Sequence, residues 1–311
     1  MFDTMFTALL PVVILMALGW LGGRKRYFKR EDVSVLATFV VRYALPVSLF
    51  LGALHTPPEK LQNLPFVACM LLGFVGTYVV ALLVGLYVFR HDLKTATMQA
   101  LVCTFPDMAY FGAPILQQVC GPEGFIAVLV GNLITSLVIL PATLMLTSWS
   151  ERGNGADTPL RTLWTCLRNT VTNQMVWLPV LGVVLSFKGV VLPAALQESA
   201  TLLGHAAGGV SLVTLGLMFH GERPSFNANV AFNIGLKNLF QPLLMALGIV
   251  LFGVEHGFAL QALIVGAVPT AIAASMLALK NDTYVAHASD SVVIGTVLAV
   301  LGEAVLILLV T

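Results

Sequence analysis

Charged side chains are scarce in this sequence, and their scarcity bounds the class of protein. Asp, Glu, Lys and Arg make up 10% of the 311 residues, whereas 58% of the residues are hydrophobic. A water-soluble domain has about a quarter of its residues charged, so the composition excludes a soluble fold and predicts an integral membrane protein. The formal net charge of +1 gives no reason to expect nucleic acid as a partner.

Cysteine is also rare, and the sequence lacks the common catalytic motifs. The four cysteines lie within or beside apolar runs and form no spaced pairs, so neither a disulfide framework nor a metal site is predicted. There is no Gly-Lys-Ser/Thr phosphate loop and no His-Glu-x-x-His motif. We expect no cofactor and no enzymatic activity. Two alternatives stay open: an intramembrane aspartyl enzyme that uses Asp107 and Asp290, and an anion channel.

Long apolar runs dominate the chain instead. A membrane-spanning helix needs about 20 apolar residues, and ten runs approach or exceed that length. They cover roughly 4–22, 33–54, 64–89, 95–119, 123–147, 173–188, 198–219, 229–253, 257–280 and 285–310. Because these runs are too long and continuous for barrel strands, all ten are predicted to be transmembrane helices. The lipid bilayer is therefore an expected partner.

The basic residues are distributed unevenly between the connecting loops. Loops after the odd-numbered runs hold twelve Lys or Arg, and loops after the even-numbered runs hold two. Basic residues concentrate on the cytoplasmic side of a membrane. We therefore expect a multi-pass protein of the cytoplasmic (inner) membrane with both termini outside.

The two halves of the chain resemble each other. LLPVVILMALGWLGGR in the first run is similar to WLPVLGVVLSFKG in the sixth, and QALVCTFP in the fourth run is similar to QALIVGAVP in the ninth. This order predicts a five-helix repeat at 1–147, a cytoplasmic linker at 148–172 and a second five-helix repeat at 173–311. An odd number of spans per repeat inverts the second half, which is typical of secondary transporters.

Four short segments resemble motifs of one family. DMAYFGAP from Asp107 to Pro114 is similar to the Asn-x-Gly-Phe-x-Gly-x-Pro element of the auxin efflux carriers, and VPTAIAASMLAL is similar to their Met-Pro-(Ser/Thr)-Ala element. VRYALPVSLF and SDSVVIGTVLAVL resemble two further elements of that family, in the same order. The short central loop resembles the bacterial members, and DMAYFGAP looks most like their malonate transporters.

That resemblance implies a fold and a mechanism. The implied fold is an all-α membrane protein of two inverted five-helix repeats, like the sodium/proton antiporters and bile-acid transporters, in which broken helices 4 and 9 cross at mid-membrane. Helices 1, 2, 6 and 7 would form a scaffold, and the other six a transport core. The sequence departs from the family pattern at Asp107 and Ala273, where the family has Asn, and at Ala109, where it has Gly.

Prolines account for the expected breaks. Proline lacks an N–H and clashes with the preceding turn, so we expect Pro106 and Pro114 to unwind the helix between them and Pro269 to break the ninth helix. Freed backbone groups must be buried in protein or line a water-filled cavity. The N-terminal ends of the resulting half-helices would carry partial positive charge and attract a carboxylate. A simple pair of kinks in packed helices is the alternative interpretation.

Polar residues inside the runs are candidates for the site, because such residues are costly in lipid. Asp107 is a candidate for both substrate binding and coupling, and Lys237 and Asp290 could form a coupling pair. Asn132 could bind substrate or join two helices, and Arg42 could face the substrate, pair with Asp107 or extend to the membrane surface. Further expected substrate-binding residues are Tyr110, Gly112, Pro114, Pro269, Thr270 and Ser275.

The sequence thus predicts a secondary active transporter of a small organic anion. The best single prediction of the substrate is malonate or a similar dicarboxylate, and proton symport is the expected form of coupling. The sequence leaves the oligomeric state open, a homodimer included.

Overall fold

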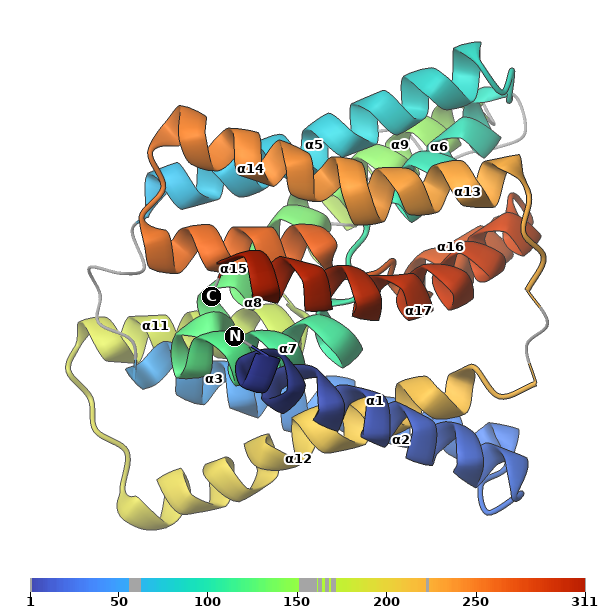
Figure 1. Cartoon of the computed structure of the whole chain (residues 1–311). Helices are drawn as coiled ribbons and strands as arrows, with labels where there is room; N and C mark the ends of the chain where they lie inside the picture. The colour runs from blue at the N-terminus through green and yellow to red at the C-terminus, as the bar shows by residue number, and fades with distance from the viewer. Residues whose placement is uncertain are drawn as a thin grey trace.

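The computed structural model describes residues 2–55, 63–150, 161, 164–165, 168, 172–221 and 224–310. Within these residues the secondary structure is helical, apart from an isolated β-bridge between Pro106 and Thr270 (Figure 1). The first half contains α1 (Phe2–Arg24), α2 (Arg30–Phe39), η1 (Val40–Ala44), α3 (Leu45–His55), α5 (Leu64–Tyr87), α6 (Leu93–Thr104), η2 (Met108–Gly112), α7 (Ala113–Cys120), η3 (Gly121–Gly124), α8 (Phe125–Ile134), η4 (Thr135–Ile139) and α9 (Leu140–Ser150). The second half contains α11 (Gln174–Phe187), α12 (Ala194–Met218), α13 (Ala228–Gly235), η5 (Leu236–Phe240), α14 (Gln241–Phe252), α15 (His256–Ala267), α16 (Ile272–Lys280) and α17 (Val285–Val310).

Several helical stretches are long and apolar enough to cross a bilayer. Among the described residues there are six, and they cover Asp32–His55, Leu64–Tyr87, Met108–Ser150, Ala194–Met218, Ala228–Phe252 and Val285–Leu306. Shorter apolar helices cover Leu10–Arg24, Gln174–Phe187 and His256–Ala267. An all-helical integral membrane protein is therefore supported, and each of the ten apolar runs of the sequence contains helix. The organisation into two inverted repeats stays a prediction.

Four short π-helices interrupt the α-helices, and each ends two residues before a proline. In a π turn the N–H donates five residues back, as Ala113 N–H does to the carbonyl of Met108. A proline in an α-helix leaves a carbonyl four residues back without a donor and clashes with it. The wider π turn accommodates that defect without ending the helix. The π-helices and their prolines are η1 with Pro46, η2 with Pro114, η4 with Pro141 and η5 with Pro242.

The expected unwinding between Pro106 and Pro114 is therefore wrong in its extent. The chain leaves the helix only at 105–107, and it is helical again from Met108 onward. Pro114 lies inside the continuous helical stretch 108–120, and the wider turn of η2 before it accommodates its missing N–H. The break in the ninth run covers 268–271, between α15 and α16, and contains Pro269 as predicted.

The helices pack in two groups. α1, α2, α3, α11 and α12 pack against one another, and α5, α6, α13, α14, α15 and α17 form the other group together with α8, α9 and α16 (Figure 1). Glycines allow close approach in the first group: a Cβ at Gly182 would lie 2.6 Å from the carbonyl oxygen of Phe50. Such small residues are typical of helix pairs in membranes.

The two broken helices cross where their breaks, 105–107 and 268–271, lie side by side. The backbone N–H of Asp107 donates to the carbonyl of Pro269 at 2.8 Å, and the N–H of Ala271 donates to the carbonyl of Phe105 at 2.8 Å. These bonds satisfy backbone groups that the breaks release, as burial away from water demands. The crossing brings together the C-terminal ends of α6 and α15 and the N-terminal ends of η2 and α16.

Candidate functional site

A cavity of about 430 Å³ lies beside the crossing, between the two helix groups. We call it the Asp107 cavity, and its lining includes Arg42, Asp107, Tyr110, Asn132, Asn173 and Ala273. Its volume is in the range of small-molecule sites. The structure therefore brings four of the predicted substrate-binding residues, Arg42, Asp107, Tyr110 and Asn132, to one space.

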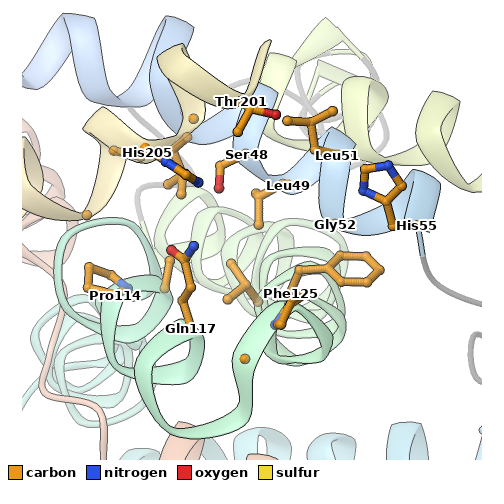
Figure 2. Close-up of a pocket in the computed structure, with 18 of the residues that line it drawn as sticks. Ser48, Leu49, Leu51, Gly52, His55, Pro114, Gln117, Phe125, Thr201 and His205 are labelled. Atoms are coloured by element: carbon orange, nitrogen blue, oxygen red, sulfur yellow. The ribbon is translucent and has the colours of Figure 1, made fainter. Parts of the chain in front are cut away.

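A second cavity, of about 280 Å³, lies along α7 and α12. We call it the Gln117 cavity. Figure 2 shows Ser48, Gln117 and His205 approaching one another across it from three different helices. Ala109 lines this cavity and the Asp107 cavity alike. Both cavities therefore reach the same residue, two positions after the break in the fourth run.

Asp107 caps the helix that follows it. Its Oδ1 accepts from the backbone N–H of Tyr110 at 3.1 Å, in the manner of an N-cap residue. The side chain is 2% exposed, and its second oxygen, Oδ2, is buried without a hydrogen-bond partner. One half-helix N-terminus is thus neutralised by a side chain of the protein itself, and one carboxylate oxygen is left unpaired beside the cavity.

The other half-helix N-terminus has no such cap. Ala271 is the N-cap of α16, and its methyl side chain makes no cap hydrogen bond to the first turn of this helix. The first N–H groups of an α-helix lack intrahelical partners and attract anions together with the helix dipole. Ala271, Ile272 and Ala273 all line the Asp107 cavity. Because Ala273 replaces the Asn of the family pattern, the approach to this N-terminus is unobstructed by a longer side chain.

Two further residues with donor groups line the same cavity. The Nδ2 of Asn132 is buried and has no hydrogen-bond partner among the described residues. Arg42 is exposed and belongs to η1, on the opposite helix group. An anion in the cavity would therefore meet an uncapped helix N-terminus, an amide donor and a guanidinium.

The other predicted substrate-binding residues lie outside this cavity. Gly112 packs beside Val268, Pro114 lines the Gln117 cavity, and Ser275 bonds its own helix through the carbonyl of Ile272 at 2.8 Å. Pro269 and Thr270 hold the crossing together. The carbonyl of Pro269 accepts from Asp107, and the hydroxyl of Thr270 donates to the carbonyl of Val102 at 2.8 Å.

The expected pair of Lys237 and Asp290 is not formed. Lys237 Nζ donates to Oε1 of Gln241 and to the carbonyl of Gly266, whereas Asp290 Oδ2 accepts from the hydroxyl of Ser225 at 2.9 Å. Sequence reasoning did not identify Gln241. Its spacing of four residues from Lys237 places both side chains on one face of the helical stretch, and that spacing was the available signal.

Asn173 and Thr38 also line the Asp107 cavity and were not identified from the sequence. Asn173 caps α11 by accepting from the N–H of Met175 at 3.0 Å, and Thr38 donates to the carbonyl of Ser34 at 2.7 Å. Both residues make local hydrogen bonds of a common kind, and nothing in the sequence distinguishes them. Only the packing of the two helix groups shows that they line the cavity.

Comparison with known proteins decides the family. The model of the family described as "Membrane transport protein" matches residues 4–307 of the chain. The chain belongs to this family. The match confirms the resemblance to the auxin efflux carriers.

Related proteins carry the same kind of name. The chain is 25% identical over 288 residues to the "Uncharacterized transporter YfdV" of Escherichia coli (strain K12), which covers 89% of this chain and 88% of that protein. It is 26% identical over 301 residues to the "Putative malonate transporter" of Rhizobium meliloti (strain 1021), with 94% and 91% covered. An "Uncharacterized transporter" of Methanothermobacter thermautotrophicus is also 26% identical, with 93% of each chain covered. The protein is a membrane transporter and not an enzyme.

Proposed function

We propose that this protein is a secondary active transporter of a small organic anion, with a dicarboxylate such as malonate as the preferred substrate. The observation that carries this proposal is the uncapped N-terminus of α16 at the Asp107 cavity. Asp107 already caps the N-terminus of η2, so α16 offers the free positive end for a substrate carboxylate. The name of the Rhizobium meliloti relative agrees with malonate.

A dianion would find a second contact in the same cavity. One carboxylate would bind the first N–H groups of α16, and the other would accept from Asn132 Nδ2 and approach the Arg42 guanidinium. Charge-assisted hydrogen bonds of this kind are about twice as strong as neutral ones. A monocarboxylate would make only the first set of contacts, so it would bind more weakly.

The two cavities support transport by alternating access. Both lie between the two helix groups, one on each side of the crossing, and both include Ala109. The Asp107 cavity contains Arg42 and Asn173, close in sequence to the loops with many basic residues, and so would face the cytoplasm. The Gln117 cavity would face outside. Movement of the group that carries the crossing against α3 and α12 would expose the bound anion to each side in turn, as in other inverted-repeat transporters.

The position of Asp107 is the reason for proposing proton symport. An unpaired buried carboxylate is costly as an anion, and a dianionic substrate beside it adds repulsion. Proton uptake by Asp107 would relieve both costs when the substrate binds. The protein would then move substrate and proton together across the cytoplasmic membrane.

The intramembrane aspartyl enzyme has no support in the structure. Asp290 hydrogen-bonds Ser225, whereas Asp107 caps η2 at the crossing. A fixed channel would also have no use for two cavities separated at a helix crossing.

Purified protein in proteoliposomes tests the proposal. Uptake of radiolabelled malonate should exceed uptake of acetate and should be driven by an inward proton gradient. Asn132→Ala should weaken malonate uptake, and Asn238→Ala is the matched control, because Asn238 is also within a helix but donates to the carbonyl of Gly295 at 3.0 Å. Equal uptake of acetate and malonate would contradict a dicarboxylate site. Absence of carboxylate uptake under every gradient would contradict the anion substrate altogether.

A further inference from the structure

Lys237 is a buried lysine of η5, in the predicted transport core. Its side chain is 1% exposed, and Nζ donates to Oε1 of Gln241 and to the carbonyl of Gly266 at 3.1 Å. A buried lysine is costly unless its charge is compensated. The charges that compensate it therefore indicate what it does.

The compensating groups belong to the two broken helices. Gly266 is in the last turn of α15, whose final carbonyls lack intrahelical donors. Gln241 extends the contact to α6, because its Nε2 donates at 3.4 Å to the carbonyl of Thr104, the last residue of that helix. Lys237 and Gln241 together thus bind the C-terminal ends of both half-helices, which carry partial negative charge.

The surroundings of Lys237 are those of a cation site. They contain the C-terminal end of α15 and the amide oxygen of Gln241, and Gln241 in turn bonds the C-terminal end of α6. Half-helix C-terminal ends and unwound carbonyls coordinate Na⁺ in transporters with broken helices.

We infer that Lys237 is a tethered cation that takes the place of a bound coupling ion. Its amino group occupies the position of a cation at the C-terminal end of α15 and, through Gln241, beside that of α6, so the core needs no Na⁺ to be stable or to transport. This inference rests on the proposed role of the crossing as the transport core. It adds that the cationic group at the crossing is covalently attached and cannot dissociate, which leaves the proton as the exchangeable cation.

The test removes the charge of Lys237 and leaves in place the two oxygen atoms to which Lys237 donates. Lys237→Met keeps the unbranched apolar part of the side chain and frees Oε1 of Gln241 and the carbonyl of Gly266. Lys237→Arg keeps the charge, and Lys280→Met removes an exposed lysine at the end of α16 as the control. Thermal unfolding of each purified protein is compared in NaCl, KCl and choline chloride at equal ionic strength.

The wild type and Lys280→Met should have the same Tm in all three salts. Lys237→Met should have a lower Tm in choline chloride and should regain about 3 °C or more in NaCl, because Na⁺ binds the vacated site of the folded state. If both Lys237→Met and the shorter neutral variant Lys237→Gln fail to fold while Lys237→Arg folds, the need for a fixed cation is supported.

Two results would overturn the inference. One is a wild-type Tm, or a wild-type uptake rate, that depends on Na⁺. The other is a Lys237→Met protein destabilised equally in all three salts, which would make Lys237 a packing residue only. Because the Tm measurement needs no substrate, its outcome is independent of whether malonate is transported.

Discussion

The backbone N–H of Asp107 donates to the carbonyl of Pro269, a residue 162 positions later in the chain, at 2.8 Å. With the reciprocal bond from Ala271 to Phe105, this contact joins two helix breaks into one crossing. Pro106 and Pro269, the prolines of the two breaks, have no N–H to donate. The crossing therefore depends on backbone carbonyls and on the N–H groups of neighbouring residues. The same residue, Asp107, also caps η2 and lines the cavity, which couples the crossing to the proposed substrate site.

Replacing Pro269 should damage that crossing. The last helical bond of α15 runs from the N–H of Val268 to the carbonyl of Ile264 at 2.9 Å. Pro269→Ala restores an N–H, so α15 can extend by a residue and draw the Pro269 carbonyl away from Asp107. We expect malonate uptake to fall at least about tenfold, which corresponds to the loss of one or two buried hydrogen bonds, while circular dichroism and monodispersity are unchanged.

Pro114→Ala is the matched control for this prediction. Pro114 already lies within a helix that η2 begins, so its replacement should reduce uptake much less than Pro269→Ala does. Equal losses in the two variants would mean that the break in the ninth run has no special role. Full activity of Pro269→Ala would mean the same.

The sequence predicts the helices better than their interruptions. In the described part of the chain outside 151–172, the apolar runs locate the helices to within a few residues, because the bilayer fixes their length. Pro106 and Pro269 also identify the two breaks. Pro114 does not mark a break as the sequence predicts, because the π-helix that precedes it accommodates the missing N–H. A change from a four-residue to a five-residue spacing of backbone hydrogen bonds leaves no mark in the apolar pattern.

Only some residues of the candidate site can be predicted from the sequence. Asp107 and Asn132 are polar in apolar runs, and that alone marks them as unusual. Nothing in the sequence shows that Lys237 bonds the carbonyl of Gly266 and not Asp290, because both are polar residues of the same half. The uncapped state of α16 likewise depends on backbone geometry at Ala271.

Asn132 should contribute directly to substrate affinity. Its Nδ2 is buried and unpartnered beside the cavity, so a bound carboxylate would supply its missing acceptor. We expect Asn132→Ala to raise the malonate Kd about tenfold, as the loss of a hydrogen bond to a charged group predicts. Isothermal titration of purified protein measures this. Asn238→Ala should lower the Tm and leave the malonate Kd unchanged. If Asn132→Ala instead lowers the Tm and leaves the malonate Kd unchanged, Asn132 is a helix-packing residue.

The close contact between α1 and α12 should be sensitive to a single methyl group. A Cβ at Gly216 would overlap the carbonyl of Met16, whereas a Cβ at Gly209 on the same helix meets nothing within 4 Å. We expect Gly216→Ala to lower the Tm by several degrees, since overpacking costs about 1–3 kcal/mol. Gly209→Ala should have no effect or raise the Tm slightly. Equal Tm values for the two variants would contradict the packing of these helices.

The predicted orientation can be tested with two exposed residues in different connections. The C-terminal end of α1 and the connection from α11 to α12 lie on opposite sides of the molecule (Figure 1). Tyr27 follows α1 and is 74% exposed, whereas Val191 follows α11 and is 83% exposed. In a background without native cysteines, a membrane-impermeant maleimide added to intact cells should label Val191→Cys and not Tyr27→Cys. Labelling of Tyr27→Cys alone would place both termini in the cytoplasm and reverse the assignment of the two cavities.

Replacement of Asp107 tests the proposed proton coupling. If Asp107 takes up a proton as the dianion binds, malonate affinity must rise as the pH falls, because protonation and binding favour each other. Asp107→Asn provides a neutral side chain that still caps η2 through its carbonyl oxygen, so it should bind malonate with an affinity that varies little with pH. Asp107→Ala removes the cap as well and should bind weakly at every pH. The measurement is the malonate Kd of each protein between mildly acidic and mildly alkaline pH. A wild-type pH dependence that survives in Asp107→Asn would place the proton site elsewhere and leave Asp107 as a helix cap only.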